Sequence, residues 1–351
     1  LAMIRKRLRT VTKFVGVLSI PAALAFLVPG EANAQINSLD RHGSVYYGTI
    51  SSINGCGTVA CATAALSNYR FVVVGGDLFT NTHFDYVNSK RIISNLWFSG
   101  KTKVYGYVPI GSNVVGIDNL LMGVVSNHIQ QFYDNYRNGA TSFLDGIFLD
   151  EYSYDWMPGK TNVRVRRQNP AADKVHSVAT PRWNVIANGF VVQHCLGTNN
   201  DAGWPNTVYN PTVAPSRLSN GDYYCYENWV WWTSNGSSAL YEPKTAWLDK
   251  NNELLNTQGL QYTNTQPKIK VFSISVDAAG TTPTQMSNLS RVTNQARFAW
   301  WCILATGWKY WQYGEYNFSG SGAGADRLFY VKQSNQNVGN TYKSSLKEVT
   351  N

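Results

Sequence analysis

Asp145-Gly146-Ile147-Phe148-Leu149-Asp150-Glu151 is an apolar run that ends in two adjacent acids. Its β-branched and aromatic residues predict a buried strand from Gly146 to Asp150. Burying a carboxylate costs free energy unless the charge is matched or used, so a buried strand has little structural reason to end in two acids. The pair therefore indicates either a turn that faces water or the mouth of a site.

Seven similar runs are spaced along the chain on both sides of this one. Together they predict eight strands, at Ser44 to Ile50, Phe71 to Gly75, Lys103 to Ile110, Gly146 to Asp150, Asn184 to Asn188, Tyr223 to Glu227, Lys270 to Val276 and Trp308 to Tyr313. Helical patterns lie between several of them, at Thr58 to Asn68, Asp85 to Phe98, Ile117 to Tyr136 and Pro283 to Leu304.

Strands that alternate with helices form a parallel sheet, and eight such units predict an α/β fold of one domain, the (β/α)8 TIM barrel. A doubly wound open sheet is the structural alternative. It is disfavoured because no Gly-x-Gly-x-x-Gly sequence follows the first strand.

The first residues have the pattern of a leader. Five basic residues lie between Arg5 and Lys13, an apolar run extends from Phe14 to Val28, and Ala32-Asn33-Ala34 is a small-x-small cleavage site. We therefore predict a signal peptide over residues 1–34, the barrel over 35–325 and a polar C-terminal tail over 326–351.

This pattern predicts a secreted protein, extracellular or periplasmic, with no stable membrane insertion once the leader is removed. An uncleaved membrane anchor is the alternative. The apolar run is short for a bilayer span, however, and Pro21 interrupts it.

The charge of the chain is mildly basic. Its 351 residues include 30 Lys and Arg against 21 Asp and Glu, a formal +9, and the leader holds five of the bases and one of the acids, which leaves +5 for the rest. No dense basic face or nucleic-acid motif accompanies this bias, so nucleic acid is not an expected partner. The densest cluster, Arg164, Arg166 and Arg167, is interpreted as a solvated loop or as a contact for an acidic substrate.

Five cysteines in an exported chain indicate some pairing. Cys56 and Cys61 are the best candidates for a disulfide, Cys195 and Cys225 are candidates for a second, and Cys302 is expected to be a buried free thiol. Neither these cysteines nor the histidines have zinc-ligand spacing, so we expect no metal and no cofactor. Four histidines are expected to lie at the surface or to have a structural role, namely His83, His128, His176 and His194.

Active sites of TIM barrels lie at the C-terminal ends of the strands. Five acids fall at those ends, namely Asp77, Asp150, Glu151, Glu227 and Asp277, whereas the opposite strand starts are Lys103, Lys270 and neutral residues. Chance would scatter acids over both ends, so this distribution favours catalysis. A carboxylate rim with no cysteine suits glycosyl transfer, in which one acid protonates the leaving oxygen and another attacks or activates water.

Adjacent strand residues point to opposite faces, so Asp150 and Glu151 cannot both face the barrel unless the chain turns between them. We expect Asp150 to point inward as nucleophile or base, Glu227 to be the general acid and Glu151 to tune their ionisation. Aromatic and polar side chains at the same rim would bind the sugar. The expected substrate-binding residues are Asp77, Tyr107, Asn188, Trp229, Asp277 and Gln312.

Several short blocks carry a family resemblance. They are Gly106-Tyr107-Val108-Pro109-Ile110-Gly111, the run from Asp145 to Glu151, the lone Glu227, and Ala296-Arg297-Phe298-Ala299 through Gly307 with Tyr310 and Tyr313. Together they are similar to the spherulin-4 and endo-α-1,4-polygalactosaminidase group of barrel glycosidases.

The resemblance implies a secreted, endo-acting α-glycosidase for a galactosamine-containing exopolysaccharide, with Asp150, Glu151 and Glu227 as its catalytic carboxylates. The segment from Pro158 to Pro181 is interpreted as an insertion that departs from the family pattern. This departure leaves the substrate more open than the reaction.

Two other functions remain as alternatives. A non-catalytic glycan-binding protein on the same scaffold would keep the aromatic groove and bind polysaccharide or oligosaccharide without cleaving it. A phosphate-binding barrel enzyme would use Ser319-Gly320-Ser321-Gly322-Ala323-Gly324, which follows the last strand. In the preferred interpretation the partner is a polysaccharide or oligosaccharide and the protein is a monomer.

Overall fold

The computed structural model describes residues 42–75, 77–111, 122–153, 161–179, 181–189, 191–196, 210–227, 231–235, 238–241, 249, 269–277, 299–300 and 310–314. All of them fall within one compact unit, Asp40–Val331. The predicted signal peptide (1–34) and C-terminal tail (326–351) lie outside the described residues. So do Trp229, Cys302, the run 319–324 and all of the predicted helix 283–304 except residues 299–300.

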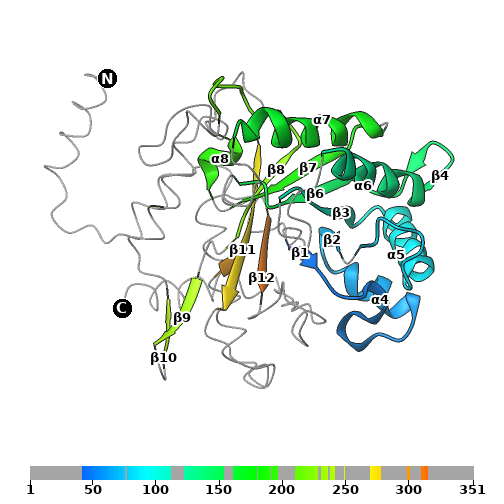
Figure 1. Cartoon of the computed structure of the whole chain (residues 1–351). Coiled ribbons are helices and arrows are strands. Elements are labelled where there is room, and N and C mark those ends of the chain that lie inside the picture. The colour runs from blue at the N-terminus through cyan, green and yellow to red at the C-terminus, as the bar shows by residue number, and fades with distance from the viewer. Residues whose placement is uncertain are drawn as a thin grey trace, which may run out of the picture. The chain divides into compact units, whose positions relative to one another are not determined.

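Eight parallel strands of the described chain form a barrel (Figure 1). Each pairs with the next in the order β1 (Gly43–Tyr46), β2 (Phe71–Val74), β3 (Lys103–Pro109), β6 (Gly146–Asp150), β7 (Asn184–Asn188), β8 (Tyr223–Tyr226), β11 (Lys270–Asp277) and β12 (Tyr310–Gly314). These are the eight strands predicted from the sequence, and their common direction confirms the α/β class.

Closure of the barrel between β12 and β1 uses few main-chain bonds. His42 and Trp311 form one parallel bridge, and their rings stack with centroids 4.4 Å apart. The Gln312 amide then bonds to both backbone groups of Val45: its Oε1 accepts from Val45 N at 2.7 Å and its Nε2 donates to Val45 O at 3.3 Å. The chain therefore forms a (β/α)8 TIM barrel, and the open-sheet alternative is wrong.

Helices cover the outside of the strands (Figure 1). They are α4 (Val59–Leu66), α5 (Tyr86–Ser99), α6 (Met122–Asn135), α7 (Asn169–Val178) and the short α8 (Val192–Leu196). The side chain of Thr58 caps α4 by accepting from Cys61 N, and Gly100 ends α5 at a φ of 64°. Three of these helices were predicted: α4 and α5 within a few residues of both observed ends, and α6 within one residue of its C-terminal end.

The helix α7 lies in a segment that the sequence analysis interprets as an insertion. Between Pro158 and Pro181 the structure has a π-helical turn, Arg164–Gln168, that runs directly into α7. This segment is therefore the helix that connects β6 to β7. It was missed because Arg164, Arg166 and Arg167 make its first turn polar and obscure the helical pattern.

Smaller elements complete the described chain. They are the 3-10 segment Ile50–Gly55, the hairpin of β4 (Arg137–Asn138) and β5 (Thr141–Ser142), and the hairpin of β9 (Trp231–Asn235) and β10 (Ser238–Tyr241). β9 pairs in parallel with the end of β11. None of the helices in the described ranges is long and apolar enough to cross a membrane.

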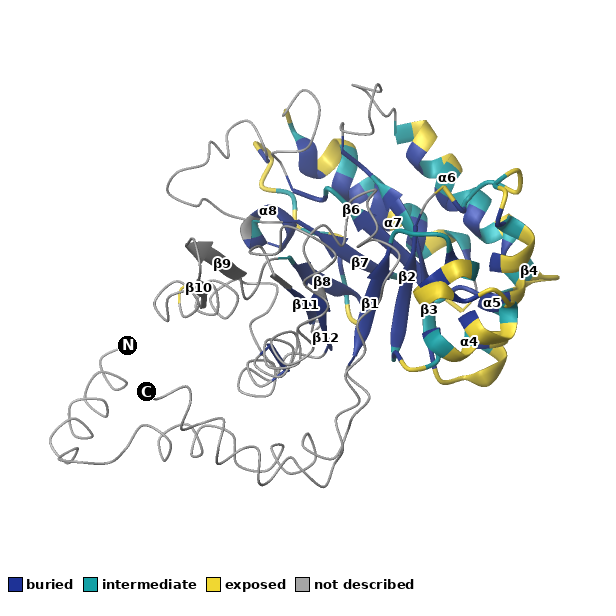
Figure 2. Ribbon diagram, turned by 90° about the horizontal axis from the view of Figure 1, so that it is seen from below, coloured by how far each residue is buried: buried dark blue, intermediate teal, exposed yellow. Residues whose placement is uncertain are grey.

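The barrel interior is filled by side chains from alternate strand positions, as the two-residue period of a strand requires. Figure 2 shows the strands buried and the outward surfaces of the helices exposed. Burial of each large apolar side chain stabilises the fold by about 1.5–3 kcal/mol. The interior layer consists of Val45, Phe71, Val73, Tyr105, Phe148, Ile186, Tyr223, Cys225, Phe272, Ile274 and Tyr310.

Two aspartates, one half-buried and one fully buried, tie together strand starts at the N-terminal end of the barrel. Asp145 precedes β6 and accepts from Val104 N of β3 at 3.0 Å, and Asp222 precedes β8 and accepts from Val185 N of β7 at 2.8 Å. The expectation that this rim lacks acids is therefore wrong. It failed because only the residues inside the predicted strands were considered.

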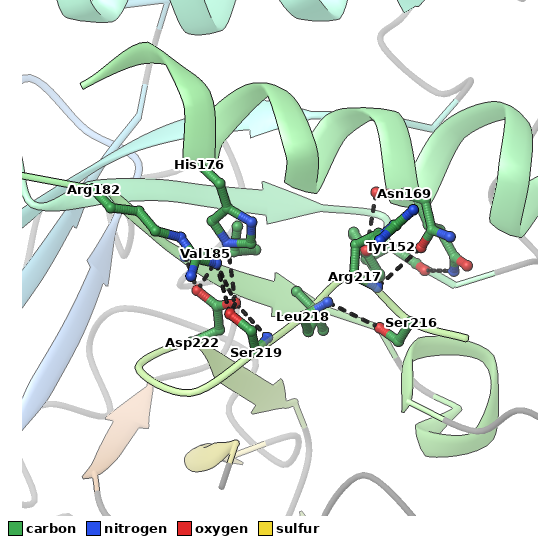
Figure 3. Close-up of polar contacts among 11 residues, drawn as sticks. Tyr152, Asn169, His176, Arg182, Val185, Ser216, Arg217, Leu218, Ser219 and Asp222 are labelled. Carbon is green, nitrogen blue, oxygen red and sulfur yellow. Dashed lines mark hydrogen bonds and ion pairs between the residues drawn. The ribbon is translucent and has the colours of Figure 1, made fainter. Parts of the chain in front are cut away.

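Asp222 is the centre of a polar cluster (Figure 3). Its side chain is fully buried, accepts from Ser219 N at 2.6 Å and lies 3.1 Å from His176 Nε2 and 3.8 Å from an Arg182 nitrogen. In TIM barrels, residues at the N-terminal end of the strands contribute to stability and active sites lie at the C-terminal end. We therefore assign Asp222 a structural role.

One cysteine prediction is confirmed and another is wrong. Cys56 and Cys61 form a disulfide. Cys195 and Cys225 are buried and are not joined by a disulfide. The predicted bridge between them fails because Cys225 packs in the barrel interior, while the Cys195 sulfur lies on α8 and faces the Tyr152 carbonyl at 3.8 Å.

The basic cluster is also placed differently from its prediction. Arg164 is fully buried and donates to the carbonyl oxygens of His194 and Cys195 at 3.0 and 3.1 Å. Arg167 donates to the carbonyl oxygen of Ile110 at 2.9 Å. These two arginines hold loops together, and the interpretation of the cluster as a solvated loop is wrong for them.

Candidate active site

A polar layer lies one step beyond the apolar interior, toward the C-terminal ends of the strands. Side chains two residues apart on a strand share a face, so the residues that follow Val45, Tyr105, Phe148, Ile186 and Cys225 by two positions point toward the same barrel interior. These residues are Tyr47, Tyr107, Asp150, Asn188 and Glu227. The alternation of the strands therefore gathers two acids, an amide and two phenols at one end of the barrel.

Asp150 is the best-connected acid of this layer. Its Oδ2 accepts from the Tyr107 hydroxyl at 2.5 Å, and its Oδ1 accepts from Asn188 Nδ2 at 2.7 Å and from Glu151 N at 2.8 Å. Three donors around one carboxylate fix its orientation and stabilise its ionised form.

The chain turns directly after Asp150. Glu151 has a φ of 56°, in the left-handed region that costs a residue with a Cβ about 1–2 kcal/mol. The turn aims the Glu151 N–H back at the Asp150 carboxylate, and Tyr152 N then donates to the Asn188 carbonyl at 2.6 Å. Both adjacent acids can therefore lie near the barrel mouth. Strain of this kind is concentrated at functional sites.

Burial and mutual repulsion set the ionisation of the pair. Burial raises the pKa of Asp150, and the hydrogen bonds from Tyr107, Asn188 and the Glu151 N–H oppose that shift. Burial and the charge of Asp150 raise the pKa of Glu227 to about 8, opposed by a hydrogen bond from the Asn188 side chain. Glu227 therefore holds a proton at neutral pH, next to an Asp150 carboxyl group whose ionised form is favoured by its three donors.

Two tyrosines border the carboxyl pair. Burial and then the charge of Asp150 raise the pKa of both Tyr107 and Tyr47, so both phenols stay neutral. Their rings meet edge to face at 5.3 Å. The charges of Glu151 and Glu227 also raise the pKa of Tyr107, which indicates that all three acids lie around this hydroxyl.

The other predicted substrate residues are more scattered. Asp77 is exposed, has a φ of 58° and lies near His128 of α6, where its charge opposes the lowering of the His128 pKa by burial. Asp277 is the last residue of β11 and pairs with Trp232 of β9. Gln312 is used to close the barrel, and Trp229 lies outside the described residues.

Sequence reasoning missed one member of the site. Tyr47 falls inside the predicted first strand, but the observed strand ends at Tyr46 and Tyr47 was assigned no role. Tyr47 lies two residues after Val45, so its side chain was predictable as pointing to the same face of the strand, one step beyond the apolar layer. Tyr107 and Asn188, expected to bind substrate, both donate hydrogen bonds to Asp150.

No metal centre is formed by the residues that the structure describes. They contain no group of three or more His, Cys, Asp or Glu side chains placed to hold an ion. The chemistry that this site can perform with its own side chains is proton transfer and nucleophilic attack by carboxyl groups.

No protein-family model and no curated protein matches this chain. Similar solved structures include a cellulase in complex with an inhibitor, at 11% identity and a TM-score of 0.47, over 83% of this chain and 90% of that chain. An endoglucanase from Pseudomonas stutzeri is 10% identical with a TM-score of 0.41, over 85% and 92% of the two chains. A Rubisco from Pyrococcus horikoshii OT3 is 8% identical with a TM-score of 0.38, over 81% and 54%. Likenesses this distant carry no argument about activity.

Proposed function

We propose that this protein is a secreted glycoside hydrolase that cleaves a polysaccharide with Asp150 and Glu227. The observation that carries the proposal is the Asn188 amide, which bonds to both carboxyl groups while Glu227 retains a proton and Asp150 is surrounded by donors. A protonated acid beside an ionised one is the arrangement that glycosidic cleavage requires.

The reaction would proceed by retention of anomeric configuration. A single amide group can bridge two carboxyl groups only when they are close, which fits the separation of about 5 Å in retaining enzymes better than the larger gap that holds a water in inverting ones. An Asp150 oxygen would bond to the anomeric carbon while the Glu227 proton passes to the departing glycosidic oxygen. Glu227 would then take a proton from water as the water oxygen displaces Asp150.

The sequence resemblance supports a finer proposal about the substrate. It favours endo-acting cleavage of α-glycosidic bonds in a galactosamine-containing exopolysaccharide, with Glu151 as a third carboxylate at the mouth. The leader pattern supports a location outside the cytoplasm. The Cys56–Cys61 disulfide is consistent with that location, because disulfides persist in oxidising compartments.

Release of reducing ends from amino-sugar and neutral polysaccharides tests the proposal. We expect cleavage of at least one polymer, and a loss of about 100-fold or more in kcat for Asp150→Asn and for Glu227→Gln. Asp173→Asn is the matched control, because its side chain is 57% exposed on α7 and forms only a surface pair with Arg217.

Near-normal turnover in both active-site variants would overturn the assignment of these residues. Binding of a polymer without cleavage by the unmodified protein would instead favour the alternative, a non-catalytic glycan-binding protein.

A further inference from the structure

The loop between β2 and α5 carries an exposed aromatic ring. Phe84 is 80% exposed, the highest value among the large apolar side chains in the described ranges, and its ring centroid lies 4.5 Å from that of His83. Because the loop follows β2, it belongs to the same C-terminal rim as the carboxyl pair. An aromatic ring in water at a catalytic rim is a candidate platform for a ligand.

Hydrogen bonds hold both ends of the loop that carries Phe84. The adjacent Asp85 is only 2% exposed and accepts from Ser51 Oγ at 2.6 Å, from Ser51 N at 3.1 Å and from Ser89 Oγ at 3.1 Å. Two side chains of the α6 region hold the other end of the loop. They are Asn135, which donates to the Phe79 carbonyl at 2.7 Å, and Tyr136, which donates to the Leu78 carbonyl at 2.9 Å.

A small pocket next to this loop shares one lining residue, Tyr47, with the active site. It has a volume of about 60 Å³, room for a few water molecules. Tyr47 lines the pocket and also packs against Tyr107, which donates to Asp150. The complete lining is Tyr47, Gly48, Thr49, Ile50, Gly75, Leu78 and His83.

We infer that His83 and Phe84 form a subsite for a hexopyranose unit of the substrate, separate from the unit that Asp150 attacks. The inference rests on the proposed function. The apolar face of the sugar ring lies on Phe84, and an exocyclic group such as the hydroxymethyl enters the pocket, which is too small for a whole ring. His83 Nδ1 accepts from Asp85 N at 3.1 Å, so a neutral His83 carries its proton on Nε2 and can donate to a sugar hydroxyl.

A subsite at this place has a consequence for substrate length. A chain bound across Tyr47 reaches both the carboxyl pair and the Phe84 platform, so long oligosaccharides gain contacts that short ones lack. The enzyme is then selective for internal bonds of a polymer.

The test compares Phe84→Ala with Phe98→Ala, using length series of α-1,4-linked galactosamine and glucose oligosaccharides. Phe98 is the matched control, because it is 69% exposed at the end of α5 and belongs to the N-terminal rim. We expect Phe84→Ala to raise KM for long oligosaccharides about fivefold, with kcat and the KM of the shortest substrate unchanged. Phe98→Ala should change neither parameter.

Binding is measured separately in the Asp150→Asn background, which removes turnover. There Phe84→Ala should weaken affinity for the long oligosaccharides by the same factor. If the protein cleaves oligosaccharides but Phe84→Ala and Phe98→Ala behave alike, the subsite is wrong and the proposed function stands. If the unmodified protein binds long oligosaccharides through Phe84 without cleaving them, the proposed hydrolysis is wrong and the subsite stands. Absence of both binding and cleavage overturns both.

Discussion

Asn188 illustrates how one side chain sets the chemistry of two others. Its amide donates to Asp150 and also bonds to Glu227, so it holds the two carboxyl groups together while their charges repel. The pair lowers this repulsion by keeping one proton, which resides on Glu227 because Asp150 has more donors around it. A residue expected to contact sugar thus acts first on the acids.

The pH dependence of activity follows from this proton. The pKa of Glu227 is raised from 4.5 to about 8, so the general acid is protonated below about pH 8 and ionised above it. We expect kcat/KM to fall as pH rises through that value, which a pH–rate profile on the cleaved polymer measures. A rate that stays constant to pH 10 would contradict the role of Glu227 as general acid.

Stability should depend on pH through the same group. Between about pH 4.5 and 8 the folded protein holds a proton on Glu227 that the unfolded chain does not, so the free energy of unfolding falls as pH rises through this window. Glu227→Gln removes that dependence and should unfold at a higher temperature than the unmodified protein at pH 9, with little difference at pH 4. Thermal unfolding of the two proteins at both pH values checks this, and parallel curves at every pH would contradict it.

At the scale of elements, the two ends of the strands have different functions. Acids at the C-terminal ends of β6 and β8 form the candidate site, whereas Asp145 and Asp222, directly before the same strands, bond to backbone N–H groups of neighbouring strands. The sequence shows acids at both places and does not distinguish them. The distinction depends on which backbone donors a side chain reaches, and that depends on strand register.

The structural role of Asp222 can be tested by stability. Asp222→Ala leaves the buried N–H of Val185 and the half-buried N–H of Ser219 without their acceptor, so we expect a loss of about 3 kcal/mol in the free energy of unfolding. Asp173→Ala, which breaks only an exposed pair with Arg217, should cost less than about 1 kcal/mol. Urea unfolding of both variants measures the difference, and equal losses would show that the cluster in Figure 3 contributes little.

The prediction of elements was most successful for strands. All eight barrel strands were located from their apolar and β-branched runs, because a buried parallel strand requires such residues throughout. The helix α7 was missed because Arg164, placed where a polar loop is expected, is buried by bonding to main-chain carbonyls. The carbonyl oxygens that allow Arg164 to be buried are about thirty residues away in the sequence, so no local sequence pattern indicates that this arginine is buried.

At the scale of the whole molecule, closure of the barrel depends on a contact between residues 267 positions apart. Gln312 takes the place of a missing main-chain rung between β12 and β1 by bonding to both polar groups of Val45. Local sequence patterns cannot reveal such a contact. The count of eight strands therefore predicted a barrel, but the hydrogen bonds that close it were not predicted. The same residue had been expected to bind substrate.

These two roles of Gln312 predict different results. Gln312→Leu keeps the size of the side chain but leaves the Val45 N–H and carbonyl unpaired, so we expect a loss of about 1–3 kcal/mol in the free energy of unfolding. Affinity for oligosaccharides should not change in the folded protein. Urea unfolding together with oligosaccharide titration measures both quantities, and unchanged stability with weakened sugar binding would support substrate binding as the role of Gln312.

The backbone of Glu151 carries a consequence for how this chain can change over generations. Glycine adopts a φ of 56° at no steric cost, so a glycine at this position would give a more stable fold than the glutamate found there. Selection for stability alone would therefore favour losing the side chain. A glutamate in such a conformation indicates a trade-off, in which the protein forgoes part of its stability for a third carboxylate at the mouth of the barrel.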